Sequence, residues 1–216
     1  MKVARLLVAV LGCLLFVSGC APIHASLKEG EPLPEGKVLL VGAIVLDPPV
    51  DQGELINYDV RGMSRGVIRF AMTKDLSKKV DMQAMLPISP EEILLMNLKG
   101  VSFVPLQSGT LYIRMGIMDV SSRASTLTMP TGPGGSAGFK GIDVSSLYLV
   151  RDLKIEIPAK AKAVYIGTIV FKHDGAKATG VQVRDDFKQA VTELTAKNIP
   201  GIKPKDVVKK LAQVVR

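Results

Sequence analysis

Few residues in this 216-residue chain have the types and spacing that chemistry requires. Two cysteines and two histidines, His24 and His173, are present. A hydrolase triad needs a histidine beside a nucleophile, and a zinc site needs several Cys or His ligands. Neither is expected, because His24 lies in a Pro- and Gly-rich stretch and His173 in a predicted turn. The tightest acidic pair, Asp185 and Asp186, is explained by capping of a helix, so we predict no catalytic residue, no metal site and no cofactor.

The first twenty residues have the composition of a secretion signal. Lys2 and Arg5 precede the twelve apolar residues 6–17, and the small residues Ser18 and Gly19 follow. A basic start, an apolar middle and a small-residue cleavage site are typical of a secretory signal peptide. A helix of twelve residues, at about 1.5 Å per residue, is too short to cross a hydrocarbon core of about 30 Å. We therefore predict that residues 1–19 are removed.

The end of this segment, Val17-Ser18-Gly19-Cys20, resembles the lipobox of bacterial lipoproteins. The resemblance implies a diacylglyceryl group on the Cys20 sulfur, cleavage before Cys20, and acylation of the new amino group, for example with palmitate. Cys13 is removed with the signal, so Cys20 has no disulfide partner in the mature chain, in agreement with lipidation. Two or three acyl chains, at about 0.8 kcal/mol per buried methylene, form a stable membrane anchor. The alternative is a plain signal peptide that is cut near Ala21 or Ala25.

Composition limits the partners of the mature chain. Loss of residues 1–19 leaves 197 residues, enough for one large or two small domains, and lowers the net charge from +8 to +6 because Lys2 and Arg5 are lost. The chain has no Trp, four Tyr and six Phe, so nucleic-acid binding by base stacking is not predicted. The basic excess fits an ordinary solvated surface or attraction to the acidic envelope.

Residues 20–36 are predicted to be a lipidated Cys followed by a flexible tether, because they contain three prolines and two glycines and no apolar period. Residues 37–184 then form a β-domain with period-two alternation. Its predicted strands cover residues 37–46, 67–73, 101–106, 109–120, 147–157, 164–171 and 179–184. The first of these is apolar on both faces, which indicates a central strand. Residues 93–96 fit a strand as well as a short helix that starts at Ser89.

Alternation also predicts which side chains face the core. In the strand over 109–120 these are Leu111, Ile113, Met115 and Ile117. In the strand over 147–157 one parity is apolar except at Arg151, which predicts a bulge near Arg151-Asp152. Residues 185–216 change to a period near 3.6 and are predicted to form two docked helices. The first is capped by Asp185 and has Glu193 and Lys197 as an i,i+4 pair, and the second begins at Lys205 or Asp206.

The most loop-like segment is 121–141, which is rich in Gly, Ser and Pro. It lacks the Gly-Lys-Ser/Thr ending and the following helix that a phosphate-binding loop needs. We predict a mobile surface hairpin loop there. Function on a β-scaffold lies in its loops, so this segment supplies the candidate binding residues. They are Gly132, Gly134, Gly135, Phe139 and Lys140.

Three stretches carry a family resemblance: LQSGTLY at 106–112, IPAKAKAVYIGTI at 157–169 and VRDDF at 183–187. Together they are similar to bacterial envelope lipoproteins with a transthyretin-like or carboxypeptidase-regulatory-like domain. The resemblance implies a mainly β fold, an antiparallel β-sandwich (transthyretin/Ig-like) with a C-terminal helical segment, and no active site. Gly167 is expected where another backbone or ring approaches closely.

These observations predict a lipid-anchored, non-catalytic protein of the bacterial cell envelope, which contacts the membrane through its lipid and binds a protein partner. By analogy with enterobacterial sorting, Ala21 favours the outer membrane, and either the periplasmic face or the cell surface fits. A small-ligand or glycan-binding periplasmic module is the alternative, and a hydrolytic enzyme is the least favoured.

Overall fold

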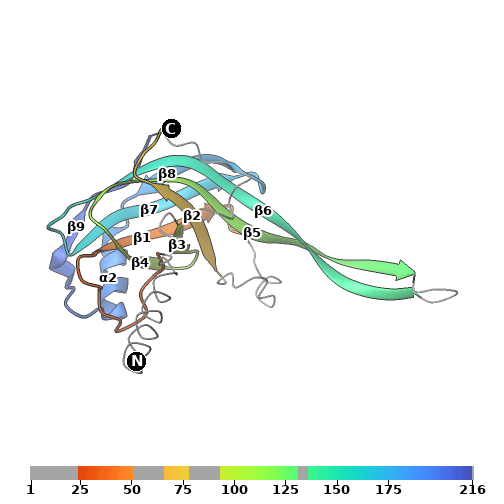
Figure 1. Cartoon of the computed structure of the whole chain (residues 1–216), viewed down its shortest axis with the longest axis horizontal. Helices are drawn as coiled ribbons and strands as arrows, with labels where there is room; N and C mark the ends of the chain where they lie inside the picture. The colour runs from red at the N-terminus through yellow and green to blue at the C-terminus, as the bar shows by residue number, and fades with distance from the viewer. Residues whose placement is uncertain (1–23, 51–65, 78–92, 131–135, 216) are drawn as a thin grey trace, which may run out of the picture.

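Two five-stranded sheets form the body of the protein (Figure 1). The structure, a computed structural model, describes residues 24–50, 66–77, 93–130 and 136–215. Within these residues one α-helix, α2 (Phe187–Lys197), lies near the C-terminus. The predicted mainly β fold with a C-terminal helix is therefore confirmed.

The first sheet has the order β4-β1-β7-β8, with the short β9 also beside β7. Its strands are β1 (Val38–Asp47), β4 (Val101–Leu106), β7 (Ala163–His173), β8 (Ala178–Arg184) and β9 (Val207–Lys209). β1 pairs with β7, and β7 with β9, in the parallel direction. The prediction of antiparallel pairing is therefore wrong for these two pairs. Most of the second sheet separates β1 from β7 in the chain, so no short hairpin forces them to be antiparallel.

The second sheet is antiparallel throughout and has the order β10-β6-β5-β2-β3. Its strands are β2 (Val67–Thr73), β3 (Ile93–Asn97), β5 (Gly109–Pro130), β6 (Ser136–Ile157) and β10 (Gln213–Val214). The ambiguity at residues 93–96 is resolved as a strand, whereas Ser89 lies outside the described residues.

The main core lies between the two sheets. Phe70 of β2 stacks on Phe171 of β7 with ring centroids 6.0 Å apart. The core residues of β6 are those predicted from parity: Leu147, Leu149, Leu153, Ile155 and Ile157.

The predicted bulge at Arg151-Asp152 is present, and it shifts the alternation of the neighbouring strand. Ile113 pairs with Leu153 and Met115 with Val150, so two residues of β6 oppose Arg114 alone. Leu111 and Ile113 belong to the main core as predicted. Met115 is buried as predicted, although it is not part of the main cluster. Beyond the bulge Met118 belongs to the main core, whereas Ile117 is only half-buried, so the prediction for Ile117 was wrong because a bulge interrupts strict period-two alternation.

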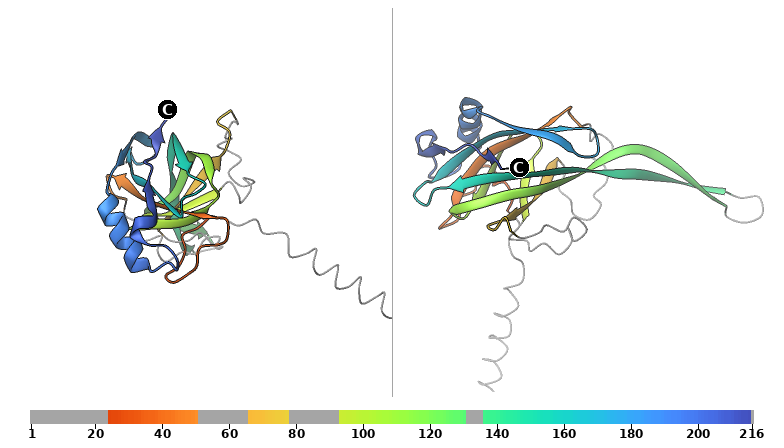
Figure 2. Two further views of the ribbon diagram at one scale, coloured as in Figure 1. Left: turned by 90° about the vertical axis from the view of Figure 1, so that its left-hand side faces the viewer. Right: turned by 90° about the horizontal axis from the view of Figure 1, so that it is seen from above.

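The opposite face of the first sheet is covered by α2, which makes a third layer (Figure 2). Ala190 and Leu194 of α2 pack with Leu39 and Val41 of β1 in a second apolar cluster. Both faces of β1 are therefore buried, as the sequence predicts. At Gly167, φ is +98° and an added Cβ would lie 3.0 Å from the backbone oxygen of Arg184, so the expected close approach of another backbone is confirmed.

Two predictions for the C-terminal segment are wrong. After α2 the chain forms a 3₁₀ turn, Pro204–Asp206, followed by β9 and β10 instead of a second helix. Pairing with the edges of β7 and β6 outweighs the helical spacing of the valines, because tertiary context overrides weak propensity. Glu193 does not pair with Lys197 but accepts hydrogen bonds from the Val101 amide (2.7 Å) and the Gln189 side chain (3.0 Å). The N-cap residue is Asp186, although Asp185 Oδ1 accepts the Phe187 amide at 3.3 Å.

Each end of the described chain joins the two sheets. In the N-terminal strap (residues 24–27), His24 bonds to the backbone of β3, and Leu27 donates its N–H to Phe103 O of β4 at 2.8 Å. In the C-terminal strap (residues 207–215), β9 pairs with β7 and β10 pairs with β6. Residues 24–36 are therefore not wholly a free tether: Leu27 is buried and Leu33 packs against the same cluster.

The β5–β6 hairpin continues far beyond the body as a two-stranded ribbon (Figures 1 and 2). We call its outer part, residues 119–130 and 136–146, the arm. The predicted loop is therefore wrong over 121–130 and 136–141, which belong to strands, and residues 131–135 lie outside the described residues. Glycines of β6 stand opposite hydroxyl residues of β5, as in Thr128↔Gly138 and Ser125↔Gly141. Glycine has a low β-propensity, so the strand at these positions depends on pairing with the residues across the hairpin.

Candidate functional site

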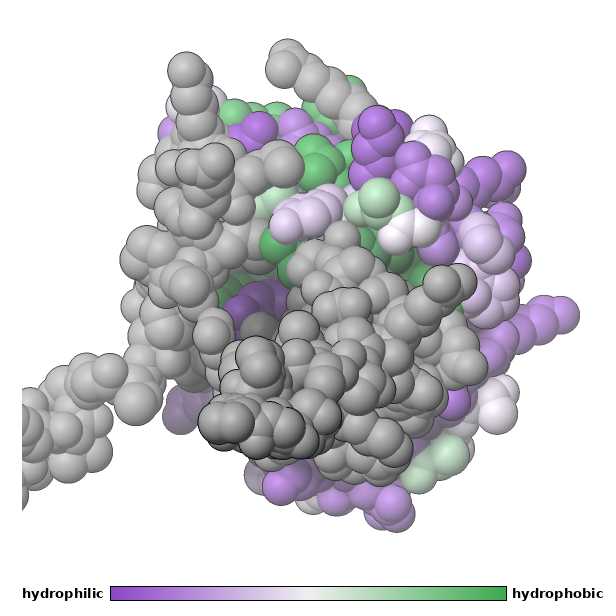
Figure 3. Space-filling view, turned by 90° about the vertical axis from the view of Figure 1, so that its right-hand side faces the viewer, coloured by the Kyte–Doolittle hydropathy of each residue, from purple (hydrophilic) through white to green (hydrophobic). Residues whose placement is uncertain are grey.

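The arm is the first candidate contact region. Eleven cross-strand pairs, from Asp119↔Ser146 to Pro130↔Ser136, form it. At about 3.3 Å per residue the arm extends roughly 35–40 Å from the body. Figure 3 views the molecule from the arm's side, where the described body surface is hydrophilic at its margins with hydrophobic residues nearer the centre. A projection of this length presents a large surface that the body does not cover.

Both edges of the arm are unpaired among the described residues. β2 pairs with β5 over Tyr112 to Ile117, and β10 pairs with β6 at Leu153 and Lys154. Neither neighbouring strand reaches the arm. Its outward-facing backbone donors and acceptors are therefore available to another strand.

Two of the five predicted binding residues, Phe139 and Lys140, lie in the arm, and the three glycines lie outside the described residues. Phe139 pairs in register with Leu127, and Lys140 with Thr126. Met129 and Ala137 form another pair two residues further along. Gly132, Gly134 and Gly135 lie outside the described residues. Binding by any of the five stays a prediction.

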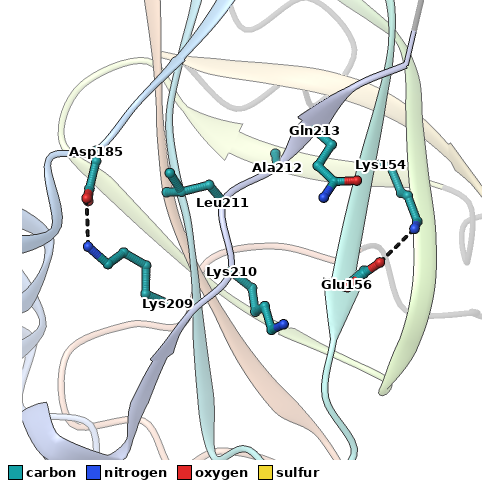
Figure 4. Close-up of a pocket in the computed structure, with 8 residues that line it drawn as sticks. All are labelled: Lys154, Glu156, Asp185, Lys209, Lys210, Leu211, Ala212 and Gln213. Carbon is teal, nitrogen blue, oxygen red and sulfur yellow. Dashed lines mark hydrogen bonds and ion pairs between the residues drawn. The ribbon is translucent and has the colours of Figure 1, made fainter.

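A cleft beneath the C-terminal strap is the second candidate (Figure 4). It has a volume of about 430 Å³ and lies between the strap, β6 and the chain before α2. Its lining residues are Lys154, Glu156, Asp185, Lys209, Lys210, Leu211, Ala212 and Gln213. The sequence prediction missed this site, because its walls come from three segments that only folding brings together.

Most charges of the cleft are already paired. Lys154 Nζ lies 2.6 Å from Glu156 Oε1, and Lys209 Nζ lies 2.7 Å from Asp185 Oδ2. Figure 4 shows Lys210 extending between these two pairs, and no ion pair forms at its ammonium among the described residues. The cleft therefore has one cation, Lys210, that forms no ion pair among the described residues, although its charge helps to lower the pKa of Glu156.

The two ion pairs shift the pKa values of the paired side chains further from neutral pH. The hydrogen bond from Lys154 lowers the pKa of Glu156, and the reciprocal bond raises the pKa of Lys154. The hydrogen bond from Lys209 lowers the pKa of Asp185. General acid–base catalysis needs a pKa near the working pH, and these shifts go the opposite way. The Lys209–Asp185 pair is suited to holding the strap in place, whereas the Lys154–Glu156 pair lies within β6.

Tyr165 positions the chain that enters α2. Its side chain is buried in the second cluster, and its hydroxyl accepts the Asp186 amide at 2.7 Å. Burial raises the pKa of Tyr165, so the phenol stays neutral. Its ring meets Phe187 edge-on with centroids 5.3 Å apart. Asp185 and Asp186 therefore occupy a structural junction.

The histidines also make structural contacts. The Gly175 amide donates to Nδ1 of His173 at 3.1 Å, so a neutral ring carries its proton on Nε2. That nitrogen lies 2.7 Å from Pro48 O and donates to it. His24 belongs to the N-terminal strap. Within the described residues, no group of three or more His, Cys, Asp or Glu could hold a metal ion.

The predicted lipidation residue, Cys20, lies outside the described residues. The short chain between Cys20 and His24 nevertheless limits how far Cys20 can be from the body. His24 is fixed to β3 by its own amide, which donates to Ile93 O at 3.1 Å, and by its carbonyl, which accepts from Leu95 at 2.8 Å. Four residues of extended chain span at most about 14 Å. Cys20 is therefore within about 14 Å of the β3 edge.

The chain matches no family model, no curated protein and no solved structure. In the described part of the chain, no helix combines the length and the apolar character needed to cross a membrane.

Proposed function

We propose that this protein is a lipid-anchored component of the bacterial cell envelope, attached through Cys20, with a non-catalytic binding or scaffold role. A relationship to transthyretin-like envelope lipoproteins, and a location at the outer membrane, belong to the same proposal. The observation that carries the binding role is the arm, which projects about 35–40 Å with both edges unpaired among the described residues. A two-stranded ribbon that projects from the body adds little to the hydrophobic core of the protein, which supports a role in contact with a partner.

The N-terminal strap supports a particular arrangement at the membrane. Because His24 is bound to β3 and Cys20 is only four residues away, an acylated Cys20 holds the β3–β4 edge close to the lipid headgroups. The body would then rest near the bilayer and could not swing freely on a long tether.

A matched pair of cysteine variants tests the anchor. Cys20→Ser removes the lipid acceptor, whereas Cys13→Ser changes the only other cysteine, inside the predicted signal. We expect the parent and Cys13→Ser to fractionate with membranes and to carry a diacylglyceryl mass on Cys20. Cys20→Ser should appear in the soluble fraction or as an unprocessed precursor. A membrane-bound mature parent with an unmodified Cys20 thiol would contradict the proposal.

The cleft favours a second candidate function, binding of a small anionic ligand. Lys210 supplies the available ammonium, and the two ion pairs close the sides. NMR titration with inorganic phosphate should shift the amide signals of residues 209–213 in the parent, and the shifts should be lost in Lys210→Gln. Lys188→Gln, on the exposed surface of α2, is the matched control. Equal shifts in all three proteins, or none in the parent, would count against this function.

A further inference from the structure

We propose that the partner of the arm is a second copy of this chain, which pairs edge to edge with it through the β5 strand. This inference rests on the proposed function in taking the arm as the contact region, and it adds the identity of the partner. The pairing is antiparallel about a twofold axis, so that each arm adds its β5 edge to the other and a four-stranded ribbon forms.

The β5 edge is the better of the two available edges. Residues 119–129 contain no Gly and no Pro, and beyond the register shift at Ser121–Arg123 their pairing is regular, so residues 123–129 can form an unbroken ladder. The β6 side of the arm contains Gly138 and Gly141, which weaken a strand. An added strand is therefore most stable along β5.

The straps cover parts of several strand edges of the body, although not the outer edge of β8, and neither strap reaches the arm. The N-terminal strap bonds to β3 and β4, and the C-terminal strap bonds to β6 and β7. Soluble proteins protect exposed edges with lysine, proline or bulges. Along β5, Arg123 is the only basic residue between Asp119 and Pro130, and the single register shift lies near the base, between Ser121 and Arg123. A two-stranded ribbon is marginally stable in water, whereas three or more strands hold together better.

Charge favours an identical partner. The arm has two basic residues, Arg123 and Lys140, and two acidic residues, Asp119 and Asp143, so its formal charge is zero, whereas the mature chain without Lys2 and Arg5 carries +6. Two copies would repel each other through their bodies, but two arms approach without net repulsion. An acidic partner would instead be drawn to the basic body. A neutral, edge-exposed ribbon is therefore best matched by another of the same kind.

Geometry restricts where the twofold axis can lie. The unpaired stretch of β5 spans residues 119–130, and a strand pairing of about six residues is typical. Overlap of six or more residues within that stretch places the axis between about residues 122 and 127. At the axis a residue faces its own copy with Cβ atoms about 4.5–5.5 Å apart. One step away, the two copies of a residue are separated by roughly a further 7 Å along the strands.

Single-cysteine scanning tests this arrangement in the full chain. Cysteine replaces residues 121–128 one at a time, and disulfide dimers are measured in isolated membranes after mild oxidation. Disulfides need Cβ atoms about 3.5–4.5 Å apart. We therefore expect one sharp maximum between residues 122 and 127, at least about fivefold above positions two residues away. Ser145→Cys on the β6 side and Lys188→Cys on α2 should stay at background.

The outcomes are distinguishable. No dimer at any arm position in folded, membrane-bound protein would overturn the second-copy inference, and the partner would then be another protein or the lipid surface. Equal dimer formation at all positions, including Lys188→Cys, would indicate random collision and would also overturn it. The parent, which retains Cys20 alone after processing, reports on the anchor separately. A disulfide dimer of the parent would reveal a free Cys20 thiol and contradict lipidation, and the scan would then be carried out in the Cys20→Ser background.

Discussion

The β5–β6 hairpin has an inner half at the body and an outer half, the arm. The same two strands run through both halves, but their surroundings differ. Near the body, residues 109–118 and 147–157 have neighbours in β2 and β10 and place their apolar parity in the core. In the arm the same strands pair only with each other among the described residues. Leu and Ile alternate in the first half, whereas Ser, Thr, Ala and Gly dominate the second. One hairpin thus combines a part that stabilises the fold with a part available for contact.

The largest difference should appear when a phenylalanine is removed from each region. Phe70 is fully buried and stacks on Phe171, so Phe70→Ala should lower the free energy of unfolding by about 3–5 kcal/mol. Phe139→Ala, in the arm, should change it by less than about 0.5 kcal/mol. Urea unfolding monitored by circular dichroism measures both. Equal losses would show that the arm and the body share one core.

Removal of the last part of the C-terminal strap, residues 211–215, should destabilise the body by a smaller amount. Truncation after Lys210 removes the bonds from Ala212 N to Ile166 O and from Val215 N to Asp152 O, together with β10. At about 0.5–1.5 kcal/mol per hydrogen bond, plus burial of Ala212, we expect a loss of about 2–4 kcal/mol. Val214→Ser, at an exposed site, is the control and should be nearly neutral. An unchanged urea midpoint after truncation would show that the strap is dispensable.

The N-terminal strap should respond to a single hydroxyl. Ser26 Oγ accepts the Phe103 amide of β4 at 2.9 Å. Ser26→Ala leaves that amide without this acceptor and should cost about 1–3 kcal/mol. Ser108→Ala, in the exposed turn before β5, should cost almost nothing. Faster hydrogen exchange at the Phe103 amide in Ser26→Ala alone would identify the cause, and equal exchange in both variants would refute it.

Acid should weaken the C-terminal strap slightly. The ordinary pKa of Asp185 is 3.8, and its ion pair with Lys209 of the strap lowers this pKa in the folded protein. Because the folded pKa is the lower one, the stabilisation is present above pH 3.8 and is lost as pH falls through the folded pKa of Asp185. Hydrogen exchange at Lys210 and Ala212, corrected for intrinsic rates, should increase in that range. Lys209→Gln should remove the Asp185 contribution, and an unchanged pH profile in that variant would contradict the assignment.

Local patterns predict the body well and the arm poorly. The double-sided apolar character of β1 and the interrupted parity at Arg151-Asp152 are properties of a single segment, and both predictions are confirmed. In the arm, residues such as Gly138 and Gly141 indicate a loop locally, and strand formation depends on partners across the hairpin. Val207 and Val208 likewise fit a helical stripe until the edge of β7 is available. The cleft was not predicted, because Lys154, Asp185 and Lys210 meet only in the folded chain. Residues 20–23 and the glycines at 132–135 lie outside the described residues, so their predicted roles stay predictions.

Excision of the arm tests the division between fold and contact most directly. In this variant an Asn-Gly turn replaces residues 120–145 and joins Asp119 to Ser146, which are already cross-strand partners. We predict a melting temperature within about 4 °C of the full chain, because a loss of 1 kcal/mol shifts a domain of this size by roughly 2–4 °C. Membrane attachment should persist, and the copy-to-copy dimer captured by a short chemical crosslinker should disappear. Loss of the folded body, or an undiminished dimer, would contradict the account.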